Sequence, residues 1–136
     1  MIADLDTIRR NAFIYEPVAG FVIIAGRTSK DNDFISVKVA APEDYWFHVR
    51  GMPGSHVLLR SLNGQEPDKR LQEAAAAVAA WHSKARNGGV TAVSMTKAKF
   101  VSKPGGVKDG TVYIKNEKVL KVRPALPEGA QPEKES

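Results

Sequence analysis

The sequence predicts one α+β domain, built from a mostly antiparallel mixed sheet, one long alanine-rich helix and a short capped helix. Three observations lead to this prediction. Short β-branched and aromatic runs recur between turn-forming segments, one segment has the alanine content and the end signals of a helix, and no internal repeat is present. A chain of 136 residues, 43% of them apolar, can bury the modest core that one such domain needs.

The N-terminal third combines one clear strand with one ambiguous segment. Residues 1–12 are expected to be a lead-in segment, and the β-branched run "FVIIAGRT" predicts a strand. The run "SKDND" is typical of a turn, and "FISVKVA" after it fits two structures. Its apolar residues alternate as in a strand, but Asn32 or Asp33 could also cap a short helix. Such a helix would bury Phe34, Val37 and Val39.

The rest of the chain predicts two paired strands, the long helix and a further region of sheet. The runs "YWFHVR" and "SHVLLR" predict strands joined by the turn "GMPG". The helix is expected to start at Pro67 and Asp68 and to end at Gly88 and Gly89. A strand, a Pro-Gly loop and a hairpin with the turn "KNEK" follow. Residues 125–136 are rich in proline and glutamate and predict a disordered acidic tail, so that the folded domain spans 13–124.

Charge is distributed unevenly along the chain, whose net charge is +5. Residues 84–123 hold ten lysines and arginines against two acidic residues, whereas residues 1–83 are nearly neutral. A basic third on a neutral body is typical of a domain with an anionic partner, although a solubilising surface gives the same pattern. The chain has no cysteine, no long apolar run and no signal-peptide pattern at its start. We therefore expect a cytoplasmic protein that does not enter a membrane.

The segment "YWFHVRGMPGSH" holds the first candidate site. In a strand Trp46, His48 and Arg50 share one face, and the alternate residues point to the core. An aromatic ring, an imidazole and a guanidinium side by side favour contacts with bases and phosphates. The glycines of the following loop, Gly54 among them, let backbone N–H groups approach an anion. Ser55 and His56 complete this first cluster, which fits an RNA-contacting edge.

Three other interpretations apply to the same segment. A nucleophile–base pair would need Ser55 to face His48 or His56, but Ser55 and His56 are adjacent and point to opposite faces of a strand. A metal site needs three convergent ligands, and the chain has three histidines, of which His82 lies in the predicted helix. The histidines could also serve only to hold a Pro-Gly turn by hydrogen bonds. We expect no catalytic residue, metal or cofactor.

A second candidate site lies in "TKAKFVSKPGGVKDG". Lys97 and Lys99 alternate along a predicted strand, and Lys103 and Lys108 flank a glycine loop that includes Gly106. Flexible glycines beside basic side chains can follow a nucleic-acid backbone, although lysines also protect exposed sheet edges from aggregation. The pattern is not a Walker loop. Two Pro-Gly loops beside cationic strands together favour RNA binding.

These motifs resemble one known family. "DYWFHVRGMPGSHV" is similar to the signature of the NFACT-R domain, the RNA-binding domain of ribosome quality-control factors of the NFACT family. "GFVIIAGRTSKDND" is similar to the glycine-rich hairpin and Asn-Asp pair of that family, and "KPGGVKDG" to its Lys-Pro-Gly segment, with Asp109 where proline is expected. The resemblance covers about residues 13–124.

The resemblance implies an RNA-binding module, with tRNA or ribosomal RNA as the ligand, that acts in translation, ribosome quality control or RNA processing. The ribosome is an expected partner. The other domains of full-length family members do not occur in this sequence, so we expect a stand-alone domain and a protein partner that supplies them. Two alternative functions remain open: an RNA-modifying or RNA-cleaving enzyme that uses His48 and His56, and an adaptor that binds another protein through a sheet edge.

Overall fold

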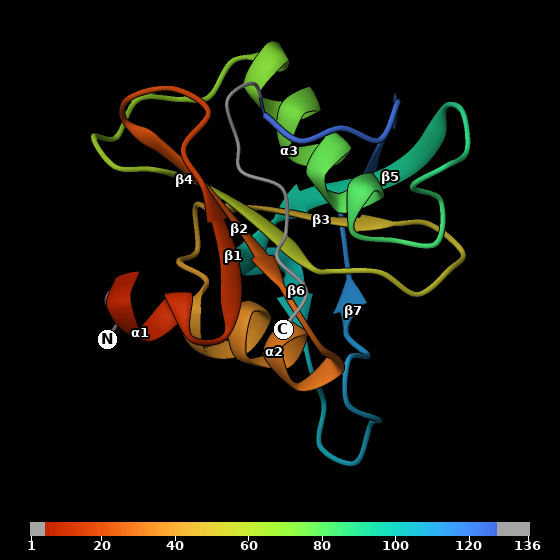
Figure 1. Ribbon diagram of the computed structural model, residues 1–136. Helices are drawn as coiled ribbons and strands as arrows, with labels where there is room; N and C mark the ends of the chain where they lie inside the picture. The colour runs from red at the N-terminus through yellow and green to blue at the C-terminus, as the bar shows by residue number, and fades with distance from the viewer. Residues whose placement is uncertain (1–4, 128–136) are drawn as a thin grey trace.

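The computed structural model describes residues 5–127 and has the predicted α+β architecture (Figure 1). Its helical elements are α1 (Leu5–Arg9), α2 (Ser29–Asp33), the π-helix η1 (Phe34–Val39), α3 (Lys69–Trp81) and the short 3₁₀ turn η2 (Ala98–Phe100). Its strands are β1 (Ala12–Tyr15), β2 (Phe21–Gly26), β3 (Tyr45–Val49), β4 (Val57–Ser61), β5 (Thr91–Lys97), β6 (Val101–Ser102), β7 (Tyr113–Ile114) and β8 (Lys118–Val122). Among these residues, no helix is long and apolar enough to cross a membrane.

Six strands form one sheet in the order β1-β2-β4-β3-β5-β8, and each pair of neighbours is antiparallel. Strands β6 and β7 form a separate two-stranded ribbon. The strands predicted at "FVIIAGRT", "YWFHVR" and "SHVLLR" are confirmed. The first forms β2 and ends at Gly26, and the last two pair with each other as β3 and β4.

Other elements pack on both faces of the six-stranded sheet and form a hydrophobic core on each. Helix α3 packs on one face, where alanines of the helix meet the alternate strand residues Phe47 and Val49. On the other face lie α1, α2 and η1, together with residues of the β6–β7 ribbon (Figure 1). Trp46 belongs to this second core and is 3% exposed. The expectation that the Trp46 face of β3 is free of core packing is therefore wrong, because a second helical layer covers it.

The ambiguous segment is helical. Thr28 caps α2, since its Oγ1 accepts a hydrogen bond from the Asp31 N–H, and the chain continues through Asp33 directly into η1. The predicted turn at "SKDND" is thus the start of the helix, and Asn32 lies inside it. Val37 is half exposed rather than buried.

Helix α3 starts where the sequence predicts and ends earlier. Asp68 is its N-cap and accepts a hydrogen bond from the Leu71 N–H. The helix ends at Trp81, not at Gly88 and Gly89. The reason is a tertiary contact: the His82 carbonyl accepts a hydrogen bond from the Ser55 N–H, and Ser83 forms a bridge with Gly54.

The two ends of the domain also differ from the expectation. Ile8 in α1 and Ala12 at the start of β1 are buried, so the expected lead-in segment contributes at least these two side chains to the core. The turn "KNEK" does not join a hairpin, because β7 pairs with β6 whereas β8 pairs with β5. In the expected tail, Ala125 donates a hydrogen bond to the Ala77 carbonyl, and residues 128–136 lie outside the described part.

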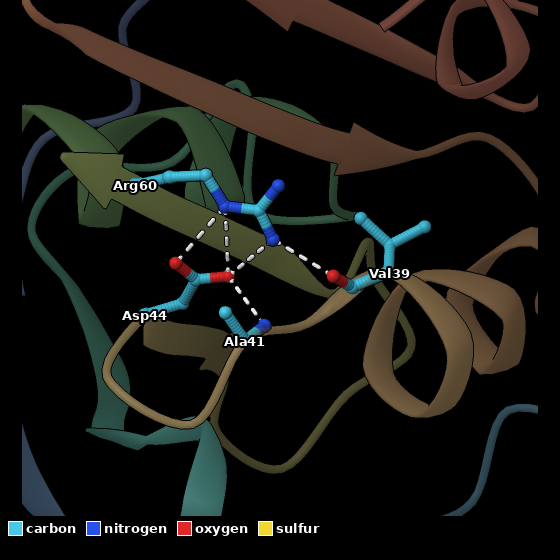
Figure 2. Close-up of polar contacts among 4 residues, drawn as sticks. All are labelled: Val39, Ala41, Asp44 and Arg60. Carbon is cyan, nitrogen blue, oxygen red and sulfur yellow. Dashed lines mark hydrogen bonds and ion pairs between the residues drawn. The ribbon is translucent and has the colours of Figure 1, made fainter. Parts of the chain in front are cut away.

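A buried ion pair joins the residue before β3 to β4 (Figure 2). The Arg60 guanidinium donates to both carboxylate oxygens of Asp44, with a shortest distance of 2.6 Å, and to the Val39 carbonyl. The same carboxylate accepts a hydrogen bond from the Ala41 N–H. Asp44 therefore has a structural partner and does not orient a histidine.

Candidate nucleic-acid interface

The two Pro-Gly loops meet at one cleft. The first loop contributes Pro53 and Gly54, and the second contributes the residues from Lys108 to Thr111. The ends of β2 and α3 complete the walls of a cleft of about 820 Å³. Four basic side chains line it: Arg27, Lys84, Arg86 and Lys108.

Two adjacent residues of α2 hold these loops in place. Asn32 donates a hydrogen bond to the Gly54 carbonyl and accepts one from the His56 N–H, at 3.2 and 3.0 Å. The Asp33 carboxylate accepts a hydrogen bond from the Gly110 N–H at 3.0 Å. One turn of helix therefore fixes the position of both loops relative to each other.

Two glycines allow this close approach. A Cβ atom at Gly26 would lie 2.0 Å from the Asn32 amide oxygen, so no other residue fits where β2 passes α2. Gly110 has a φ of +82°, a backbone conformation that L-residues with a side chain rarely adopt, at the point where its N–H meets Asp33.

Lys103 holds the second loop together from within. Its ammonium group donates to the carbonyls of Lys108 and Thr111 at 2.8 and 2.9 Å, and lies 3.3 Å from the Asp33 carboxylate. Its side chain is 18% exposed. Lys103 thus contributes to loop structure, whereas the side chain of Lys108 is exposed and Gly106 lies at the exposed tip of the loop.

The imidazoles of His48 and His56 lie next to each other, with ring centroids 5.2 Å apart. Trp46 donates from its indole N–H to the Ser36 hydroxyl, which in turn is 2.8 Å from Nδ1 of His56. His56 is 2% exposed, whereas His48 is partly buried and lines the cleft. The interpretation that His56 is structural and His48 contacts ligand stays a prediction.

Burial lowers the pKa of both histidines. For His56 the desolvation of the ring and the neighbouring His48 bring the pKa from 6.5 to about 4. For His48 desolvation also lowers the pKa, and a hydrogen bond with the Gly54 backbone opposes this shift. Both rings are therefore neutral at pH 7, which suits a buried network and leaves neither ring as a proton donor.

Lowering the pH from 7 to 5 is expected to cost about 2 kcal/mol of stability through His56 alone. The unfolded chain binds a proton at this residue near pH 6.5 and the folded chain only near pH 4, so acid favours the unfolded state. Urea denaturation at both pH values measures the difference. The variant His56→Gln should lose most of this pH dependence, and an unchanged dependence would contradict the assignment.

Three of the sequence-predicted residues that do not line the cleft are the exposed or half-buried cations Lys97, Lys99 and Arg50. Strand β5 ends at Lys97 and Lys99 lies in η2, so they do not alternate along one strand as expected. Both ammonium groups nevertheless contact Glu43, at 2.7 and 2.9 Å, which lowers the pKa of Glu43 to about 2. Arg50 is paired with Glu117 at 3.4 Å.

Neither a serine dyad nor a metal site is formed by the described residues. The Ser55 hydroxyl donates a hydrogen bond to the Gly26 carbonyl at 2.6 Å and not to a histidine. Within residues 5–127 no group of three or more metal-ligating histidine or carboxylate side chains converges. The Ser55 hydroxyl and the His56 N–H of the first motif serve to hold the loop.

The family model described as "NFACT protein RNA binding domain" matches residues 11–116. The chain belongs to this family. The match includes both Pro-Gly loops and the Asn-Asp pair of α2, so the cleft lies inside the NFACT-R domain. RNA binding is the function for which the family is named.

Relatives of this NFACT-R domain are much longer proteins. The chain is 37% identical over 110 residues to "Rqc2 homolog RqcH" of Bacillus subtilis. The aligned region covers 81% of this chain and 19% of the relative. It is 36% identical over 103 residues to the Streptococcus suis protein of the same name, covering 76% of this chain and 18% of the relative. The chain thus spans less than a fifth of these relatives.

A solved structure has the same fold. It is that of the C-terminal part of the fibronectin/fibrinogen-binding protein from Streptococcus suis, which matches with a TM-score of 0.78 and 34% identity. The match covers 85% of this chain and 46% of that structure. The NFACT-R fold is therefore shared with a piece of a larger protein.

The sequence reasoning found four of the residues that line the cleft of this NFACT-R domain and missed others. His48, Gly54, Ser55 and Lys108 were predicted. The missed residues include Phe13, Arg27, Lys84 and Arg86. The last two belong to the basic third of the sequence, so charge could have indicated them. Phe13 and Arg27 give no such signal, because only the pairing of β1 with β2 brings them to the cleft.

Proposed function

We propose that this chain binds structured RNA, either tRNA or ribosomal RNA, and that the cleft between the two Pro-Gly loops is the centre of the contact. The observation that carries the proposal is the convergence of both loops with four basic side chains, which come from three separate parts of the sequence. In the described lining, Asp109 is the one acidic residue.

The chemistry of the cleft fits a phosphate backbone. Lysine and arginine side chains neutralise phosphates and release counterions, which supplies most of the affinity for nucleic acid. Lys84 and Lys108 are exposed and come from different segments that line the cleft, namely the segment after α3 and the second loop. Hydroxyls of Thr28 and Ser29 also line the cleft and offer hydrogen bonds to sugar and phosphate oxygens.

The cellular role that follows is participation in ribosome quality control in the cytoplasm. The names of the relatives and of the family support this part of the proposal. Because the chain spans a small part of those relatives, we also propose that ribosome binding involves further domains, in the same protein or in a partner.

Measured RNA affinity shows whether lysines that line the cleft contribute more to binding than predicted lysines outside it. The double variant Lys84→Ala/Lys108→Ala should weaken binding of tRNA and of rRNA fragments, and should reduce the slope of log K against log salt by roughly 1.5. The double variant Lys97→Ala/Lys99→Ala removes the same charge outside the cleft, where Glu43 already pairs with both lysines. It should change binding much less.

Filter binding between about 50 and 200 mM salt measures both variants. Equal losses in the two variants would mean that net charge, and not the cleft, determines affinity. The absence of any RNA binding by the parent protein at low salt would refute the proposed function.

RNA cleavage by the two histidines has weaker support. The imidazoles lie on the same side of the sheet, as acid–base catalysis would need. However, such catalysis at neutral pH needs one protonated partner, and desolvation keeps both rings neutral. RNA that stays intact after long incubation with the protein is the expected result.

A further inference from the structure

The aromatic side chains in the described strands of the six-stranded sheet are all buried or only partly exposed. Many RNA-binding domains place bases against aromatic side chains on an exposed sheet face. Here α3 covers one face, and α1, α2 and η1 pack on the other, where Trp46 is buried with its indole N–H bonded to Ser36. An unpaired base that this protein binds must therefore find its planar partner at an edge of the sheet or outside it.

A cluster of three planar side chains lines the cleft. The rings of Phe13 and His82 are stacked, with centroids 4.8 Å apart and an angle of 6° between their planes. The guanidinium carbon of Arg27 lies 5.6 Å from the centroid of the same Phe13 ring. Arg27 is exposed, while Phe13 and His82 are partly exposed. The Tyr15 hydroxyl, 2.8 Å from Nε2 of His82, helps to fix the imidazole in this orientation.

The size of the cleft fits a nucleotide. Its volume of about 820 Å³ lies within the range of sites that hold drug-sized ligands, roughly 300–1,000 Å³. A paired RNA helix is too wide to enter a space of this size, whereas one nucleotide turned out of a loop or bulge is not. The cations Lys84 and Lys108 on its walls can bind the phosphates that flank such a nucleotide.

We propose that the cleft takes up an unpaired nucleotide of an RNA chain, with its base against the cluster of Phe13, Arg27 and His82 and its phosphates between Lys84 and Lys108. The inference rests on the proposed RNA binding and specifies which part of the RNA is recognised. Planar stacking tolerates every base, so it predicts a preference for unpaired over paired RNA without strong sequence selectivity.

The test compares two RNAs of equal length and charge: a hairpin with 2-aminopurine in its unpaired loop, and a blunt duplex. The hairpin should bind several-fold more tightly, and 2-aminopurine fluorescence should fall when the base stacks. The variant Arg27→Lys keeps the charge but removes the planar group, and should lower hairpin affinity about tenfold with little effect on the duplex. Arg123→Lys, an exposed position after β8, is the matched control and should behave like the parent protein.

Distinct outcomes separate this inference from the proposed function. Equal binding of hairpin and duplex, with no fluorescence change and no effect of Arg27→Lys, would overturn the inference and leave RNA binding intact. Failure of both RNAs to bind would overturn the proposed function as well. Free nucleoside monophosphate is a third ligand in the test. If it competes as well as the hairpin, the cleft recognises a free nucleotide, and the assignment to an RNA chain is wrong.

Discussion

Replacing Asp44 by alanine is expected to lower the free energy of unfolding by about 3–5 kcal/mol. The carboxylate is 5% exposed and accepts hydrogen bonds from the Arg60 guanidinium and the Ala41 N–H. Its removal leaves the charge of Arg60, whose side chain is 12% exposed, in a poorly solvated position with only the Val39 carbonyl as a partner among the contacts of Figure 2. Because domains of this size are stable by about 5–15 kcal/mol, the variant should be near the limit of folding.

The neighbouring Glu43 provides the matched control. It is also a carboxylate in an ion pair, but its side chain is 66% exposed, so Glu43→Ala should change stability little. Urea denaturation of the two variants measures the contrast. The double variant Asp44→Ala/Arg60→Met should recover part of the loss, since it removes the unpaired charge as well. Equal stability of Asp44→Ala and Glu43→Ala would show that the buried pair contributes no more than a surface pair.

The sequence predicts those parts of the fold whose causes are local. The strands β2, β3 and β4 follow from runs of β-branched and aromatic residues, and the start of α3 follows from its capping residue Asp68. The end of α3 could not be predicted from Gly88 and Gly89, because the contact between Gly54 and Ser83 stops the helix first. That contact joins segments about 30 residues apart in the chain, and no local signal encodes it.

The candidate site also has parts that the sequence predicts and parts that depend on tertiary contacts. Sequence reasoning predicted that two Pro-Gly loops act together, and both loops do line one cleft. It predicted an exposed Trp46 because alternation along a strand tells which residues share a face and not what lies above that face. The covering layer is the helix from α2 to η1, the one segment for which strand and helix patterns were both present. If this segment is predicted to be a strand, Trp46 is expected to be exposed, and the hydrogen bonds of Asn32 to the first loop are not foreseen.

Asn32→Ala is the second substitution with a large expected effect, a loss of about 2–4 kcal/mol together with an altered cleft. The side chain donates a hydrogen bond to the Gly54 carbonyl and accepts one from the His56 N–H, and the variant loses both of these bonds. Asn32 is 8% exposed, so water does not easily replace the amide. The space beside Gly26, where the amide oxygen now lies, would also become a small cavity.

Asn63 is the matched control for this substitution. It lies in an exposed loop and its amide oxygen also accepts two hydrogen bonds, from the Ser61 hydroxyl and the Gln65 N–H. Water can replace these partners, so Asn63→Ala should cost less than about 1 kcal/mol. Hydrogen exchange adds a local measurement, because the His56 amide should exchange much faster in Asn32→Ala and at the parent rate in Asn63→Ala.

RNA binding then distinguishes a loss of stability from a loss of the site. Asn32 contacts the first loop, whereas its neighbour Asp33 contacts the second loop through Gly110 and Lys103. If the fixed spacing of the two loops determines affinity, the folded molecules of the Asn32→Ala variant at low temperature should still bind RNA more weakly than the Asn63→Ala variant does. Parent-like RNA affinity of the folded variant would mean that the loops find their bound arrangement without this helix, and that the basic side chains alone define the interface.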